Sequence, residues 1–423
     1  MKLVLAAFFA VIIFYFFSKR KVEGVILLLI TALIKFEVSF GSKVIQVYQI
    51  IGLLLIVFIF VRSTARKTFL IYNKQIFKYV LLFLIGISFS ALVMRTEASF
   101  FGRLQMSFDY SILFFLTLFC IKDIDDHNKL IKGLHLGVFS VALIGIIGFV
   151  IGNPFFGLEE GGGLVFSGDY FENLEDLNRY GRTVSADRVS FSTSDPNSLG
   201  ILMVFGAILS FFNLGNKPSF YYKLFNLTSI ILFLYVVILS TSRTSFICFI
   251  ILLIFKILKD KSNIFLFIFV VFITFQIAME LGYLEKFLLR FENSDEMSSG
   301  NGRIERWIYH FNHLNLEYIL FGNSHTGFQG SFSKLSHTNY LALIYRGGIL
   351  TFISFIVLLY KLIFSRNYNK YGPYAEIGIV VLIAGISQEI INSYGPNFII
   401  WSIIASLAFV SKIKQSFVSR IQQ

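Results

Sequence analysis

The chain is poor in cysteine and in charged residues. Only 2 of its 423 residues are cysteines, and both, Cys120 and Cys248, lie inside apolar runs. This scarcity excludes a disulfide framework and argues against a cysteine-based metal site. Charged residues make up 15% of the chain and hydrophobic residues 56%, which leaves no room for a soluble domain of ordinary size.

Long apolar runs recur from end to end, and many of them match a helix that crosses roughly 30 Å of hydrocarbon at about 1.5 Å per residue. We therefore predict an all-α, polytopic integral membrane protein, with about 12–13 transmembrane helices in one transmembrane domain, residues 1–423. The first run is expected to be retained, because Lys19, Arg20 and Lys21 stand where a signal peptide would have its cleavage site. The thirteen predicted helices are 3–18, 22–36, 45–61, 76–94, 105–121, 133–152, 196–214, 224–240, 244–258, 263–281, 337–361, 373–391 and 396–411.

The basic residues indicate which loops face the cytoplasm. If successive predicted helices cross the membrane in opposite directions, the segments on one side contain 17 Lys and 5 Arg, and those on the other side contain 5 Lys and 10 Arg. The richer side is predicted to be cytoplasmic. The net charge of +12 comes from these scattered loops, so topology and anionic lipid explain it and no nucleic-acid partner is expected. The arginines of the outer side indicate an anionic ligand, because a guanidinium makes paired hydrogen bonds to phosphate or carboxylate oxygens.

The first long outer loop, residues 153–195, ends in a predicted anion site. Arg182 and Arg188 precede the sequence "SDPNSLG", in which Asp195 is a good N-cap and Asn197 lies in the first helical turn. A helix start flanked by arginines favours anions. Alternatively, "DPN" is only a cap and the arginines pair with acidic residues of the same loop.

The second long outer loop, residues 282–336, contains a predicted amphipathic helix over 303–314 that would lie in the membrane interface. The i, i+3 histidine pair on this helix lacks a convincing third ligand, so no metal site is predicted. Its polar face carries Arg303, Arg306, His310 and His313, and its apolar face Ile304, Trp307, Ile308, Phe311 and Leu314.

The sequence "SHTNYLALIYRGG" begins the helix predicted at 337–361. His337 would lie at its outer mouth next to Asn339, and Arg346 roughly 13 Å further into the hydrocarbon zone, where an ionisable group is a functional candidate. Gly347 and Gly348 would allow close approach of another helix or an acyl chain. Alternatively, Arg346 is a paired structural arginine and His337 is satisfied by a nearby loop.

A short turn, "STSRTS" at residues 240–245, places an arginine between two apolar helices. Thr244 or Ser245 could cap the second helix, which would put Arg243 beside its positive end. An anion would favour this arrangement.

These polar residues all fall on the predicted outer side. A cationic pocket that is open to lipid would suit a substrate with a phosphate head, a sugar portion and a long apolar tail. The residues that converge are Arg182, Arg188, Arg243, Arg303, Arg306, His325, His337 and Arg346.

In order and spacing, the motifs "DPN", "SRT", "R-x-x-R-W", "GNSH" and "HTNYL…GG" resemble the O-antigen polymerase (Wzy-type) and O-antigen ligase superfamily over roughly residues 180–350. The resemblance implies a metal-independent, GT-C-like glycosyltransferase without a cofactor. It also implies a place in the bacterial inner membrane, with the active site facing the periplasm.

The resemblance further implies roles for individual residues. Arg188, Arg243 and Arg303 or Arg306 would hold the pyrophosphate of a donor lipid, and His337 would be the general base. His325 is the rival base, and Asp187 and Asp195 are further candidates. Asn339 would orient the imidazole or bind sugar. The remaining substrate-binding candidates are Arg182, Asn197 and Arg346, of which Arg346 has no clear match in the family pattern.

The reaction expected from this resemblance is transfer of a growing glycan from undecaprenyl pyrophosphate to the terminal sugar of a new lipid-linked repeat unit. Expected partners are this lipid-linked oligosaccharide, membrane lipid, a chain-length regulator and a flippase. One alternative is an O-antigen ligase that joins polymer to lipid A core, although ligases match an "H-x-H-N" pattern better than "LSHTN". The other is a lipid-linked oligosaccharide transporter, which the lack of an internal repeat disfavours.

Overall fold

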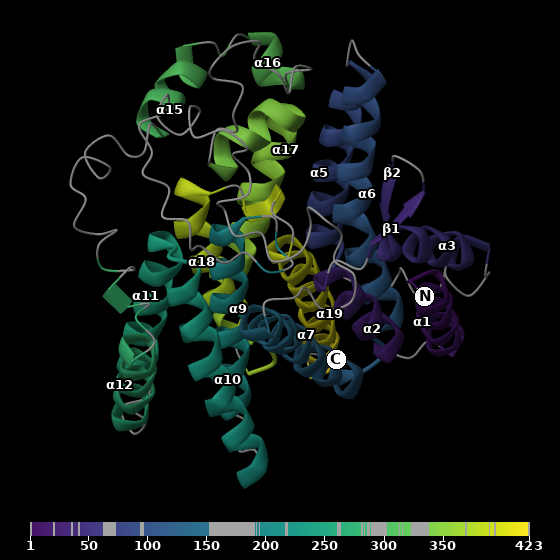
Figure 1. Cartoon of the computed structure of the whole chain (residues 1–423). Coiled ribbons are helices and arrows are strands. Elements are labelled where there is room, and N and C mark those ends of the chain that lie inside the picture. Colours follow the sequence, from purple (N-terminus) through teal and green to yellow (C-terminus); the bar gives the residue numbers. More distant parts are fainter. Residues whose placement is uncertain are drawn as a thin grey trace.

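The structure, a computed structural model, describes residues 2–19, 22–34, 37–40, 43–61, 73–93, 97–151, 191, 193, 195–215, 219–259, 264–280, 282, 284–285, 288, 303–312, 314, 316–322, 338–368, 370–388, 390–392 and 395–421. Within these residues the chain is a bundle of helices (Figure 1).

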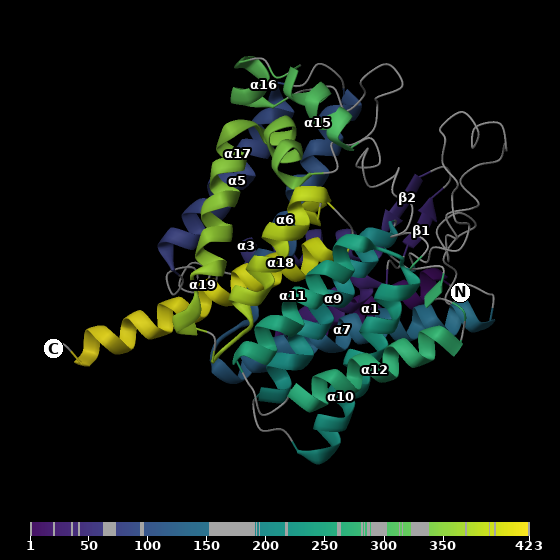
Figure 2. The same ribbon diagram turned by 90° about the vertical axis from the view of Figure 1, so that its left-hand side faces the viewer.

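A helix occupies each of the thirteen predicted ranges. The largest differences are in three helices that polar residues continue past the apolar run: α6 and α7 begin earlier than predicted, and α19 ends later. The C-terminal part of α19 extends beyond the other helices (Figure 2). The bounds are α1 Lys2–Ser18, α2 Val22–Leu33, α3 Val47–Val61, α5 Lys74–Leu92, α6 Glu97–Cys120, α7 Ile124–Ile151, α9 Pro196–Gly215, α10 Phe220–Leu239, α11 Arg243–Lys259, α12 Ile264–Glu280, α17 Asn339–Ile363, α18 Tyr374–Ser387 and α19 Pro396–Ile421.

The remaining described elements are short. They are the helices α15 Arg303–Asn312 and α16 Leu316–Phe321, the 3-10 turns η5 Arg366–Tyr368 and η6 Ile390–Asn392, and an antiparallel hairpin of β1 Glu37–Phe40 and β2 Lys43–Gln46. The hairpin corrects the prediction that helix begins at residue 45. The amphipathic helix predicted at 303–314 is confirmed as α15.

Five of the described helices are long and apolar enough to cross a membrane: α5, α7, α9, α10 and α17. The chain therefore has the helices of an α-helical membrane protein. Others are shorter. The 12 residues of α2, for example, extend over only about 18 Å, less than the hydrocarbon thickness. The prediction of about 12–13 crossings therefore stays a prediction.

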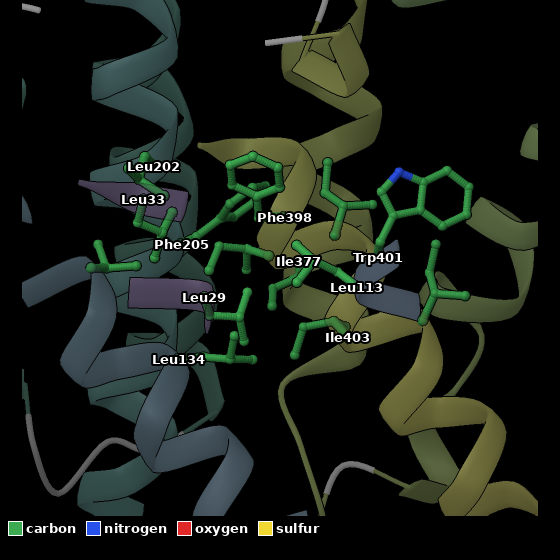
Figure 3. Close-up of a cluster of buried hydrophobic side chains, with 14 of the residues drawn as sticks. Leu29, Leu33, Leu113, Leu134, Leu202, Phe205, Ile377, Phe398, Trp401 and Ile403 are labelled. Atoms are coloured by element: carbon green, nitrogen blue, oxygen red, sulfur yellow. The ribbon is translucent and has the colours of Figure 1, made fainter. Parts of the chain in front are cut away.

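Helix α9 lies at the centre of the packing. Its side chains are buried along almost the whole helix, from Ser198 to Phe211. Figure 3 shows Leu202 and Phe205 of α9 in a cluster with Phe398 and Trp401 of α19 and residues of α2, α6, α7 and α18. Because α9 is enclosed on all sides, its first turn has a fixed position relative to its neighbours.

One set of helix ends is joined by lysines and amides, and we call it the lysine end. It includes the contacts of Lys129 Nζ with Glu23 Oε1 at 3.3 Å, Lys256 Nζ with Glu376 Oε1 at 3.4 Å, Lys361 Nζ with Gln75 Oε1 at 3.3 Å, and Asn73 Nδ2 with Ser411 Oγ at 2.9 Å. The helix ends that meet here are those that the alternating topology places on one side.

Helix α17 is broken at Gly348, where φ is 68° and ψ is −174° (Figure 1). A Cβ on Gly348 would overlap the backbone oxygen of Leu320, the penultimate residue of α16. Thr351, in the next turn, packs against Gly86 of α5. The close approach expected at the glycine pair is therefore made by α16 and α5.

We predict that Gly348→Ala destabilises the protein more than Gly282→Ala. Gly282 also has a positive φ, 72°, but a Cβ there would meet nothing within 4 Å. A positive φ costs a non-glycine residue about 1–3 kcal/mol at either position, and overlap adds about 1–3 kcal/mol at Gly348 alone. Melting temperatures of the two variants in detergent measure the difference, and equal values would contradict the packing of α16 on α17.

Candidate functional site

The start of α11 contacts two other helix ends, the start of α9 and the end of α18. Ser245 Oγ donates to the backbone oxygen of Asn197, at 3.4 Å, and so joins α11 to the first turn of α9. The hydroxyls of Thr244 and Ser387 lie 2.8 Å apart and join α11 to the end of α18. A Cβ on Gly200 would overlap Ser245, so the two helices approach at a glycine.

Two further helix starts complete this arrangement. Thr338 Oγ1 donates to the Gly385 oxygen at 3.0 Å, which joins α17 to α18. Asn339 Oδ1 accepts from the backbone N–H of Ile391 at 3.1 Å, in the turn before α19. Gly395, at the start of α19, lies against Thr193, which precedes α9. The contacts therefore return to the helix at which they began.

We call this arrangement the polar ring. It comprises the starts of α9, α11, α17 and α19 and the end of α18. Its polar members are Asp195, Asn197, Ser198, Ser242, Arg243, Thr244, Ser245, Thr338, Asn339, Ser387, Gln388 and Asn397. The lysine end holds the opposite ends of α11, α17, α18 and α19.

Asp195 caps α9, as the sequence predicts. Its Oδ2 accepts from the backbone N–H of Ser198 at 2.9 Å and from Ser198 Oγ at 3.0 Å. Its Oδ1 accepts from Asn197 Nδ2 at 3.2 Å. Both carboxylate oxygens are thus engaged in the helix start, which favours capping over the role of proton acceptor.

The turn that carries Arg243 is buried. Ser240 and Ser242 are fully buried, and Thr241 has a φ of 46°, which is rare for a β-branched residue. Ser242 Oγ accepts from the backbone N–H of Ser245 at 3.4 Å, so Ser242 caps α11. The prediction of a cap at Thr244 or Ser245 is therefore wrong, because α11 begins one residue earlier than expected. Arg243 is the first helical residue and is half-buried.

Asn339 and Arg346 lie on one face of the first segment of α17, seven residues and roughly 10 Å apart along the helix. Asn339 is fully buried and Arg346 is half-buried. Arg346 follows Tyr345, whose hydroxyl donates to the backbone oxygen of His310 at 2.6 Å. Arg346 is therefore next in sequence to the residue through which α17 contacts α15, and its position in the hydrocarbon zone stays a prediction.

Helix α15 packs on α17 through a residue of its predicted polar face. His310 is 6% exposed, and its ring centroid lies 5.0 Å from that of Tyr345. Ile308 and Phe311 of the apolar face are more than half exposed. The histidine side of α15 therefore faces protein. Figures 1 and 2 show α15 and α16 beside the upper part of α17.

The structure brings together three of the predicted site residues, Asn197, Arg243 and Asn339, with Arg346 further along α17. The backbone of Arg303 and Arg306 begins α15, but their side chains lie outside the described part of the chain. Four predicted site residues, Arg182, Arg188, His325 and His337, lie outside the described residues, as does Asp187.

Three ring residues, Ser387, Gln388 and Asn397, lie outside every motif that the sequence analysis singled out. Gln388 follows α18, and Asn397 lies in the first turn of α19. Asn397 could have been found, because "GPN" at 395–397 repeats the "DPN" of 195–197. Both sequences place a proline at the first position of a helix and an asparagine after it.

Three buried amides of the ring have atoms with unmade hydrogen bonds. They are Asn339 Nδ2, Gln388 Nε2 and Asn397 Oδ1, none of which has a partner among the described residues. An unmet bond of a buried polar group costs about 1–3 kcal/mol, and folded proteins contain few of them. The ring therefore keeps binding capacity that the described protein does not use.

One buried carboxylate near the ring has a structural explanation. Asp109 of α6 accepts from Tyr48 Oη at 2.9 Å and from Gln49 Nε2 at 3.0 Å. The centroid of the Tyr48 aromatic ring lies 5.1 Å from that of Phe398, the residue that follows Asn397 in the sequence. These contacts join α3 to α6 and to the start of α19, so we assign Asp109 to packing.

The ring is suited to an anion. The starts of α9, α11, α17 and α19 direct backbone N–H groups and the positive ends of their helix dipoles toward it. Arg243 adds a full positive charge at one of these starts. Helix starts of this kind bind phosphate groups in other proteins.

The comparisons with known proteins do not identify the chain: no protein-family model matches it, and no curated protein shows significant similarity to it.

We predict that Asp195→Asn keeps the stability of the protein, whereas Asp195→Ala lowers it. Asparagine is as good an N-cap as aspartate, and loss of the cap costs about 1 kcal/mol. Melting temperatures in detergent test the stability. An Asp195→Asn variant that is as stable as the wild type but inactive would instead identify Asp195 as a proton acceptor.

Proposed function

We propose that the protein polymerises lipid-linked oligosaccharide repeat units. A hydroxyl of the terminal sugar on one unit attacks the anomeric carbon of the glycan held on undecaprenyl pyrophosphate. A new glycosidic bond forms, the bond between that carbon and the pyrophosphate oxygen breaks, and undecaprenyl pyrophosphate leaves with the electron pair. The hydroxyl proton passes to a base of the enzyme.

One observation carries this proposal: four helix starts and Arg243 meet in a polar ring. The leaving pyrophosphate gains negative charge as the bond breaks, and a preorganised positive site stabilises that charge without having to reorganise. Because Arg243 is half-buried and fixed by its position in the first turn of α11, it can act as such a group. The order of the sequence motifs supports the choice of a glycan donor over other anions.

The base is proposed from the sequence. His337 directly precedes Thr338, whose hydroxyl is bound to Gly385 in the ring, and Asn339 follows. A histidine there would be next in sequence to residues that line the ring. An ordinary imidazole pKa of about 6.5 suits proton transfer near neutral pH.

The same site supports a GT-C-like glycosyltransferase in the bacterial inner membrane, with the polar ring on the periplasmic side. The lysine contacts at the opposite helix ends support this orientation, since lysine is enriched on the cytoplasmic side. Helix α15, with Arg303 and Arg306 in its first turns, would bring further arginines to the donor lipid.

We predict that Arg243→Ala abolishes polymer formation, with a rate loss of about 10²–10³ for removal of one charge-stabilising group. Arg243→Lys should recover only part of the rate, because an ammonium cannot make the paired contacts of a guanidinium. Purified protein is incubated with lipid-linked repeat units in the absence of nucleotide sugar, and product length is measured on gels.

The control for Arg243 is Lys223→Ala, which removes an exposed positive charge in the first turn of α10. This variant should form polymer at the wild-type rate. A wild-type protein that forms no polymer in this assay would exclude polymerisation. Formation of product only when lipid A core is added would indicate the ligase, and movement of the lipid between leaflets without product would indicate a transporter.

We predict that His337→Ala lowers the polymerisation rate by about 10²–10⁴, the usual contribution of a general base. His325→Ala should have a much smaller effect. The opposite result would make His325 the base, and full activity of both variants would contradict a histidine base. Equal amounts of each protein in the membrane fraction are required for the comparison.

A further inference from the structure

The three unmet amides of the polar ring are all buried. Asn339 is 0% exposed, and Gln388 and Asn397 are each 6% exposed. Their unused atoms are two N–H donors and one carbonyl acceptor. All three groups are uncharged, so they offer hydrogen bonds without a net charge.

The orientation of Asn339 is fixed. Its Oδ1 accepts from the Ile391 N–H at 3.1 Å, so Nδ2 is the amide atom left for a ligand. A Cβ on Gly385 would lie only 3.0 Å from this nitrogen, so the Asn339 amide packs closely against a glycine of α18. The amide is therefore presented between the last turn of α18 and the turn η6.

Gln388 and Asn397 flank the same connection. Gln388 is the residue at which α18 ends, three positions after Gly385 and three before Ile391. Asn397 lies two positions after Gly395, which packs on Thr193. The connection between α18 and α19 thus carries two of the amides, and its contact with Asn339 supplies the third.

We propose that these three amides form a subsite for the uncharged hydroxyl groups of a sugar, distinct from the pyrophosphate contact at Arg243. A hydroxyl both donates and accepts a hydrogen bond, and a set of amide donors and acceptors matches it. Phosphate oxygens only accept, so they would leave Asn397 Oδ1 without a donor, whereas a hydroxyl can donate to it. The inference rests on the proposed function. It assigns the pyrophosphate of the substrate to Arg243 and the sugar to the three amides.

The test compares two probes on the full-length protein in lipid nanodiscs, with binding measured by native mass spectrometry. One probe is undecaprenyl pyrophosphate, and the other is the lipid-linked oligosaccharide extracted from cells that lack the protein. We expect Gln388→Met and Asn397→Leu each to weaken binding of the oligosaccharide probe about 10-fold, as expected for loss of one ligand hydrogen bond. Binding of undecaprenyl pyrophosphate should not change.

Two further variants make the comparison specific. Asn226→Leu removes an amide that is also fully buried and also has an unmet atom, but it lies in α10 outside the polar ring, and it should bind both probes normally. Arg243→Ala should weaken the binding of both probes.

The outcomes separate the two proposals. Amide variants that bind both probes as the wild type does, or that lose both equally, would overturn the sugar subsite and leave the polymerase proposal standing. A wild-type protein that binds neither probe would overturn the proposed function and the subsite with it. Selective loss of the oligosaccharide probe in Gln388→Met and Asn397→Leu, with normal binding by Asn226→Leu, would support the subsite.

Discussion

Hydrogen bonds between helix ends hold the polar ring together, and the rest of the site depends on them. Inside a membrane protein, backbone groups at helix ends have no water to bind and need partners within the chain. Asp195 and Ser242 satisfy N–H groups at the starts of α9 and α11. Thr244 and Thr338 then join the starts of α11 and α17 to α18 through side-chain contacts. The same contacts thus satisfy backbone groups at helix ends and fix the geometry of the site.

The same solution makes the ring electrostatically positive. Once α9, α11, α17 and α19 begin at one place, their dipoles add there, whatever the side chains are. Prolines 196 and 396 suit the first helical position because they lack the N–H that would otherwise need a partner. The Asp195 carboxylate compensates the start of α9, so the anion-attracting part of the ring is formed by the starts of α11, α17 and α19. Arg243 adds to a field that the backbone has already set.

The length of an apolar run predicts a membrane helix well, because such a helix must match the hydrocarbon thickness. Each of the thirteen predicted ranges contains a helix. The prediction fails where polar residues continue a helix, as in the first turns of α7, which carry Asp125 and Asp126. The cap of α9 is predictable because it is local. Gln388 lies in no motif, and the "GPN" motif of Asn397 does not show that it meets the start of α9. That meeting depends on contacts between segments about 200 residues apart, such as Thr193 with Gly395. Sequence patterns of a single helix carry no record of such contacts.

The first segment of α17 connects two groups of functional candidates. At one end Asn339 is bound within the polar ring, and six residues later Tyr345 holds the backbone of His310 in α15. The break at Gly348 then lets Leu320 of α16 approach the backbone directly. Because these contacts are made by backbone and buried atoms, a shift of α15 would be transmitted to α17. Helix α15, whose first turns contain Arg303 and Arg306, is therefore joined through α17 to the ring that includes Arg243.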